Sequence, residues 1–174
     1  MNWTEFLKME IEAIYGSAIK LMDQLDESNL TWKPSTGSNW MTAGQLLQHL
    51  TNACGAPARG LVTGDWGLPE GAKYEDMPPE EIFPIAEKMP AAASVATARN
   101  LLLEDKALAL ALIDRSGEAV LNNKMVAAPW SPGDARPLGW QIFQMLLHLD
   151  RHKSQLFYYL KLQGKPVGTL DLWG

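Results

Sequence analysis

The helical spacing of apolar residues between positions 137 and 163 limits the fold more than any other feature of the chain. Pro137 begins this run and Gly164 follows it, and these are the positions that proline and glycine favour at helix ends. The apolar positions recur every three or four residues, as on one side of a helix: Leu138, Ile142, Leu146, Leu149, Leu156 and Leu160. The sequence therefore predicts a long helix over 137–163.

Three earlier segments have the same periodicity, over residues 3–26, 42–62 and 91–115. The sequence therefore predicts an all-α fold of four helices, in which residues 63–90 and 116–136 are non-helical connections. Short extended pieces are expected at 119–121 and 125–127, and Thr42 is expected to open the second helix. A connection as long as 63–90 is usually functional or a crossover.

Composition limits the class of protein and its partners. The 174 residues predict one domain, 1–174, and 47% hydrophobic with 20% charged residues is ordinary for a soluble globular protein. A net charge of −5 argues against nucleic acid as a partner. No apolar run is long enough to span a membrane, and no signal peptide is expected. The single cysteine, Cys54, fits a reducing compartment, so we expect a cytoplasmic protein.

Two of the three histidines, His148 and His152, lie four residues apart in the run 137–163. Residues at this spacing stack on one helix face, with Cβ atoms roughly 5–6 Å apart, so the two imidazoles can chelate one metal ion. One helix rarely completes a metal site, and another element must supply a further ligand. The same face carries residues of mixed polarity, which suits a semi-enclosed pocket: Gln141, Met145, Gln155 and Tyr159.

Other residues near this pocket have two readings each. His49, in the segment 42–62, has apolar neighbours on its helix face and by itself reads as a buried core histidine, but the pair on the later helix favours a ligand. Glu10 lies at the edge of the first apolar stripe and is either a boundary charge or a carboxylate that points into the metal pocket. Trp130, in a Pro/Gly loop before the last helix, is either a pocket wall or a loop anchor.

The order of these motifs resembles the DinB/YfiT-like superfamily of metalloenzymes over essentially the whole chain. The matching features are a Trp-x-Pro loop, Trp40 before a helix with Leu46-Leu47-Gln48-His49-Leu50, a long crossover, Pro129-Trp130, His148-x-x-x-His152-Lys153-Ser154-Gln155, and Tyr159 to Pro166. The usual His-Arg-Gly-Gln ending reads His-Lys-Ser-Gln here, and both departures lie outside the histidines. No acidic residue stands near the helix-two motif, where Gly44 and Gln45 occur.

The resemblance implies a four-helix bundle of up-down-down-up order, with the long crossover between helices two and three. It implies that His49, His148 and His152 bind one divalent metal ion per chain. It also implies a homodimer, and it includes thiol-dependent transferases and isomerases.

Three neutral imidazoles suit Zn²⁺ or Ni²⁺ and leave at least one coordination position open. The function we expect is activation of a low-molecular-weight thiol for a transferase-type reaction on a small-molecule substrate. The alternatives are a hydrolase that activates water at the metal and a non-catalytic metal-binding, stress-related protein. No phosphate-binding or dinucleotide-binding glycine motif is present. The expected substrate contacts, apolar and then polar, are Trp130, Trp40, Tyr159, Asn52 and Gln155.

Overall fold

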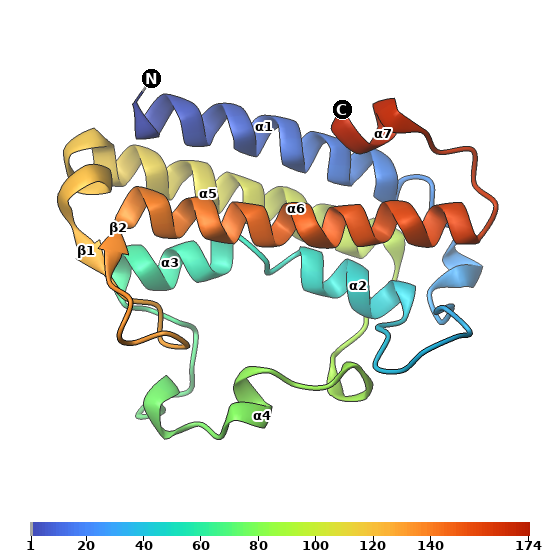
Figure 1. The fold of residues 1–174 in the computed structure, drawn as a ribbon, viewed down its shortest axis with the longest axis horizontal. Coiled ribbons are helices and arrows are strands. Elements are labelled where there is room, and N and C mark those ends of the chain that lie inside the picture. The colour runs from blue at the N-terminus through green and yellow to red at the C-terminus, as the bar shows by residue number, and fades with distance from the viewer. Residues whose placement is uncertain (1) are drawn as a thin grey trace.

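The computed structural model describes residues 2–174, and these fold almost entirely into helices (Figure 1). The three longest helices, α1 (Trp3–Met22), α5 (Val95–Asn123) and α6 (Leu138–Leu162), run side by side. Two shorter helices, α2 (Ala43–Leu50) and α3 (Gly55–Thr63), lie end to end along α5 and α6. The all-α prediction is therefore confirmed.

Short elements complete the chain. They are the helices α4 (Pro79–Ile82) and α7 (Thr169–Trp173), the 3₁₀ turns Glu27–Asn29, Tyr74–Asp76 and Ala86–Lys88, and the antiparallel strands β1 (Met125–Val126) and β2 (Arg136–Pro137). The expected helix 3–26 thus ends at Met22, and the expected helix 91–115 begins only at Val95. No helix among residues 2–174 has the length and apolarity that a bilayer span requires.

The prediction of one helix over 42–62 is wrong, because the chain breaks between α2 and α3 at residues 51–54. Pro57 explains the break: inside a longer helix its ring would clash with the carbonyl four residues back, whereas the first turn of α3 tolerates it. Asp105 of α5 then accepts hydrogen bonds from the backbone N–H groups of Gly55 (2.9 Å) and Ala56 (2.8 Å). A side chain from a distant helix therefore caps α3.

The prediction that 116–136 is non-helical is also wrong at its start, because α5 continues to Asn123. Gly117 has φ 68° and ψ 165°, so two helical segments meet there at a kink. Beyond the kink, Glu118 accepts hydrogen bonds from the backbone N–H groups of Trp3 (3.0 Å) and Thr4 (2.9 Å), which fixes this turn to the start of α1. Residues 119–121 are therefore helical, while the extended piece expected at 125–127 contains β1.

The connection 63–90 is joined to α2 by side-chain hydrogen bonds. Thr42 and Gln45 form a capping box at the start of α2, as expected for a helix that opens at Thr42. The Gln45 amide also donates to the carbonyl oxygens of Ala86 (2.7 Å) and Met89 (2.8 Å). These contacts hold the end of the connection beside the helix that carries His49.

Candidate metal centre

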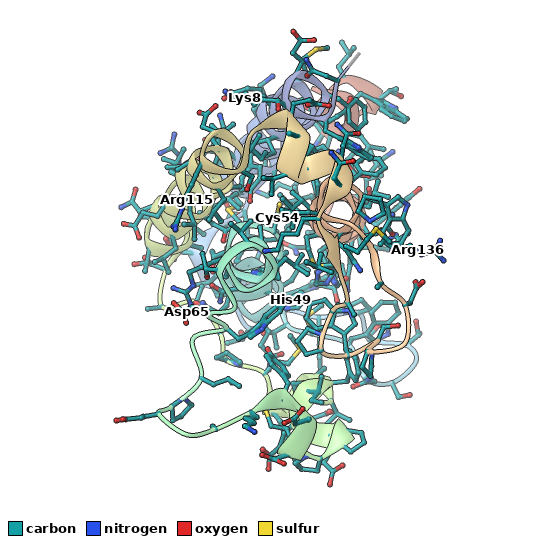
Figure 2. The ribbon with its side chains drawn as sticks, turned by 90° about the vertical axis from the view of Figure 1, so that its left-hand side faces the viewer. Lys8, His49, Cys54, Asp65, Arg115 and Arg136 are labelled. Carbon is teal, nitrogen blue, oxygen red and sulfur yellow. The ribbon has the colours of Figure 1, made fainter. Side chains whose placement is uncertain are left out.

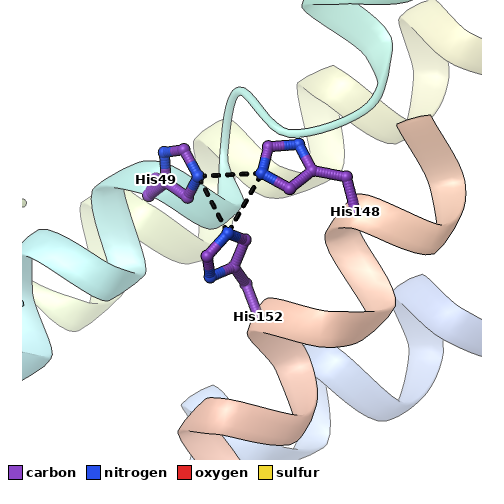
Figure 3. A group of neighbouring side chains, drawn as sticks. All are labelled: His49, His148 and His152. Carbon is purple, nitrogen blue, oxygen red and sulfur yellow. Dashed lines mark hydrogen bonds between the residues drawn. The ribbon is translucent and has the colours of Figure 1, made fainter. Parts of the chain in front are cut away.

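The three histidines of the chain meet between α2 and α6 (Figure 3). His49 comes from the last turn of α2, and His148 and His152 come from successive turns of α6. Their Nε2 atoms converge, with 3.1 Å from His49 to His148, 3.1 Å from His49 to His152, and 3.0 Å from His148 to His152. Among the described residues, this is the group of His, Cys, Asp and Glu ligand atoms that is close enough to hold a metal ion.

A chain of hydrogen bonds fixes the tautomer of His152. The carbonyl oxygen of Met41 can only accept, so the Tyr159 hydroxyl donates to it (2.9 Å). That hydroxyl accepts from the Gln155 amide nitrogen (3.1 Å), which turns the Gln155 oxygen towards Nδ1 of His152 (3.1 Å). The proton of His152 is therefore on Nδ1, and the lone pair on Nε2 faces the other two histidines.

The three Nε2 contacts cannot all be hydrogen bonds. Each hydrogen bond needs one donor and one acceptor, and Nε2 of His152 is an acceptor. If His49 and His148 both donate to it, two N–H groups face each other. If only one of them donates, two lone pairs face each other. A cation that receives all three lone pairs removes this conflict.

The spacing also fits a metal ion. Bonds of about 2.0–2.1 Å from zinc to imidazole nitrogen, at octahedral to tetrahedral angles, separate ligand nitrogens by roughly 2.9–3.4 Å. The observed separations of 3.0–3.1 Å fall within that range. The residues present can therefore hold a metal ion without rearrangement of the ligand side chains.

Burial keeps the imidazoles neutral near pH 7. Burial, followed by the positive charges of neighbouring imidazoles, lowers the pKa of His49 to about 4. Burial and the charge of His152 lower the pKa of His148 to about 4 as well, although a hydrogen bond to the backbone of Ala53 acts against this change. Burial also lowers the pKa of His152, and the hydrogen bond to Gln155 opposes that change. Neutral imidazole is the form that binds a metal.

The histidines open into a cleft of about 750 Å³, which is within the usual size range of small-molecule sites. In Figure 2, His49 lies in the lower half of the molecule, towards the green segment that contains α4. Trp130 and Asn52, two of the expected substrate contacts, line this cleft. The structure thus places Trp130 in the cleft wall, and its indole also packs edge-on against that of Trp66, at 5.7 Å between ring centroids.

The other expected contacts do not line the cleft. Gln155 instead contacts Nδ1 of His152, and Tyr159 contacts Gln155, so these two residues orient the ring. The Trp40 indole donates to the carbonyl of Thr36 (2.7 Å) and packs edge-on against Tyr159, at 6.3 Å between centroids. Glu10 is neither in the ligand group nor in the cleft lining, so the structure does not bring it to the histidines.

Sequence reasoning missed the part of the cleft wall that the 63–90 connection supplies. Trp66 and Tyr74 line the cleft with Trp130, and their rings pack edge-on at 5.6 Å. The Trp66 ring lies against Gly60 of α3 so closely that a Cβ atom there would be 2.1 Å from it. The aromatic residues Trp66 and Tyr74 in a long Gly/Pro-rich connection could have indicated that this connection contributes to the pocket.

A buried polar cluster joins α1, α5 and the start of α3. Asp105 accepts a hydrogen bond from the Tyr15 hydroxyl (2.6 Å) in addition to those from α3, and both residues are buried. Cys54 lies beside them, between the helices (Figure 2). Burial, then the negative charge of Asp105, raises the pKa of Cys54 to about 12, so this thiol is not an ionised nucleophile at neutral pH.

Comparison with known proteins agrees with this geometry. The family model described as the DinB superfamily matches residues 10–156, which include all three histidines and most of the chain. The chain belongs to the DinB superfamily. No curated protein matches it significantly. Membership in this superfamily and the three-histidine cluster support the same reading, a site that can hold a metal ion.

Proposed function

We propose that this DinB superfamily protein is a metal-dependent enzyme that activates a low-molecular-weight thiol for transfer to a small-molecule electrophile. The observation that carries the proposal is the convergence of three imidazole nitrogens on an open cleft, with no carboxylate in the ligand group of the described residues. Three protein ligands leave room for a substrate atom, as in catalytic rather than structural zinc sites.

Zn²⁺ or Ni²⁺, one ion per chain, suits a site of three imidazoles. Held by His49, His148 and His152, the ion would supply Lewis acidity that lowers the pKa of a bound thiol. In the transfer, the thiol sulfur forms a bond to the electrophile, the leaving group departs with its electron pair, and the thiol proton passes to solvent.

The protein side chains have separate roles in this proposal. Trp130 and Asn52 contact the electrophile from the cleft wall. Gln155 and Tyr159 hold His152 in the tautomer that ligates, and Trp40 packs behind Tyr159. These supporting hydrogen bonds matter because partners of metal-ligating histidines typically change metal affinity by about 10–100-fold when they are removed.

Titration of cobalt-substituted protein with small thiols tests the thiol step. Native protein is expected to give a sulfur-to-metal charge-transfer band that saturates with thiol, and His152→Ala is expected to lose it. Lys161→Ala, at the exposed end of α6, is a matched control that should keep the band. If no thiol changes the cobalt spectrum, the transferase proposal fails. Ester and amide hydrolysis would then test the hydrolase, and absence of both activities would leave a non-catalytic metal-binding protein.

We further propose that residues 1–174 form one domain, a four-helix bundle of up-down-down-up order in which α2 and α3 together take the second position. The side-by-side packing of α1, α5 and α6 supports this. A homodimer is also proposed. Its support is the family resemblance and the large apolar side chains exposed near the C-terminus: Tyr158, Leu162, Leu170 and Trp173.

A further inference from the structure

The cleft beside the histidines contains an arginine without an ion-pair partner. The three histidines are neutral near pH 7, and the charged residues that line the cleft are Asp134 and Arg151. Asp134 is neutralised by Arg136, whose Nε lies 2.6 Å from its carboxylate. Among residues 2–174, no acidic group lies within ion-pair distance of Arg151, and the adjacent Asp150 is taken by Lys153 at 2.7 Å. The cleft therefore has one uncompensated positive charge.

Arg151 lies close to the metal ligands because of its place on α6. It follows His148 by three residues, and side chains at this spacing are neighbours on a helix surface. The guanidinium group presents its N–H donors in a planar fork that matches a carboxylate or a similar oxyanion. An anion bound there would lie beside the reacting centre without replacing a histidine.

The rest of the wall is largely apolar. Trp66, Tyr74 and Trp130 pack edge-on against one another, with centroid separations of 5.6, 5.7 and 6.4 Å. Ile82 and Phe83 line the cleft from the end of α4, and Phe83 is 65% exposed although it is aromatic. A ligand with an apolar body would cover this surface and remove it from water.

We propose that the cleft is specific for amphipathic anions, that is, small molecules with an apolar or aromatic body and one oxyanion group bound by Arg151. This inference rests on the proposed function, since it names the substrate class of the same site. Arg151 is exposed, so a neutral substrate of the same shape would leave its guanidinium hydrated and would gain no charge-assisted hydrogen bond from it, whereas an oxyanion would. Arg151 therefore determines specificity.

A pair of fluorescent probes tests this specificity. 8-Anilinonaphthalene-1-sulfonate has an apolar body with one sulfonate, and N-phenyl-1-naphthylamine has the same body without the charge. In Arg151→Gln, affinity for the sulfonate should fall about tenfold or more, as expected for loss of a charge-assisted hydrogen bond, and affinity for the neutral probe should stay the same. Arg151→Lys, which keeps the charge but not the fork, should give an intermediate loss.

Two further variants locate the effect. Trp130→Ala should weaken the binding of both probes, because it removes a shared part of the apolar wall. Arg115→Gln is the matched charge control, since Arg115 is exposed on α5 and lies away from His49 in Figure 2, and it should leave both affinities unchanged. Three results would each overturn the inference: equal sulfonate binding by native and Arg151→Gln protein, equal loss of both probes, or sulfonate binding that Trp130→Ala does not affect.

The measurements are made on the full chain both metal-loaded and after chelation, with metal content determined in parallel. Sulfonate specificity that depends on Arg151 in the metal-free chain supports the inference independently of the metal. If native protein holds no metal, the proposed function fails, while the probe results still decide the role of Arg151.

Discussion

At the scale of single residues, the site depends on which nitrogen of each histidine carries the proton. In His152 the proton is on Nδ1, because hydrogen bonds run from the ring through Gln155 and Tyr159 to the carbonyl of Met41, which can only accept. For His148, a hydrogen bond to the backbone of Ala53, in the break between α2 and α3, restrains the ring. Because such contacts exist before any ion binds, the lone pairs are already directed at one point.

Removal of one ligand should abolish tight metal binding. We expect about one divalent ion per chain in native protein and a near-complete loss in His148→Ala, because the two remaining imidazoles, one from α2 and one from α6, no longer enclose the ion. The control is Gln144→Ala, which changes another cleft residue one turn earlier on α6. Elemental analysis of the purified proteins measures the ratio, and unchanged content in His148→Ala would refute the ligand assignment.

At the scale of elements, the break between α2 and α3 is stabilised from another helix. The Asp105 carboxylate satisfies two backbone N–H groups at the start of α3 and the Tyr15 hydroxyl. Gly55 is required for this approach, since a Cβ atom there would be 2.2 Å from the backbone oxygen of Asp105. Ala53 lies in this break, and its backbone forms a hydrogen bond with the ring of His148.

Loss of the Asp105 carboxylate should therefore destabilise the protein. Asp105→Ala leaves two buried donors and one part-buried donor without this partner, and we expect a loss of about 3 kcal/mol or more in the free energy of unfolding. Asp105→Asn keeps one acceptor oxygen and should cost less. Urea denaturation gives both values. A loss below about 0.5 kcal/mol in Asp105→Ala, the range of ordinary surface substitutions, would show that the cap is unimportant.

Two glycines in helices should respond in opposite directions to alanine. In Gly60→Ala, the new methyl group would clash with the Trp66 ring, so the ring must leave the cleft wall. The variant should be less stable than native protein, and its tryptophan fluorescence should change. In Gly16→Ala, nothing lies within 4 Å of the added atom, so higher helix propensity should stabilise α1 by about 0.5–1 kcal/mol. Thermal unfolding of both variants measures this contrast. Midpoint temperatures that shift in the same direction for both variants would contradict the prediction.

At the scale of the whole molecule, the metal site connects segments about a hundred residues apart. His49 and His148 are separated by 99 positions, and α2 is held to α6 at that point. The connection 63–90 runs along the side of the bundle that α2 and α3 form (Figure 1), and it supplies part of the cleft wall. The convergence of the three histidines, the shape of the cleft and the packing of the helices therefore depend on the same contacts.

The proposed homodimer is tested at this scale. Sedimentation equilibrium should give twice the chain mass of 19.3 kDa. If the exposed apolar side chains at the C-terminus form the interface, Leu162→Glu with Trp173→Glu should shift the species towards the monomer, because charged side chains resist burial at an interface. Met9→Glu, at an equally exposed apolar position on α1, is the control. A single species at the chain mass for native protein would refute the dimer.

The sequence by itself determined the helical segments and the histidine pair, because both depend on spacing along one helix. The 3.6-residue period of apolar positions indicates a helix wherever it continues, and the spacing of His148 and His152 puts them on one face in any fold. Two single-residue signals were not used: Pro57 stands inside the segment predicted as one helix over 42–62, and Gly117 lies at the kink of a helix that was expected to end at 115.

Only the tertiary structure decided which distant groups meet. Asp105 caps α3 across 50 positions, Met41 orients His152 through Tyr159, and Trp66 joins Trp130 in the cleft wall. Glu10, on α1, and Trp40, in the segment before α2, have suitable chemistry but do not line the cleft, because the helix packing places them elsewhere. The periodicity of a helix fixes which side faces the core, but the helix packing fixes which residues that side contacts.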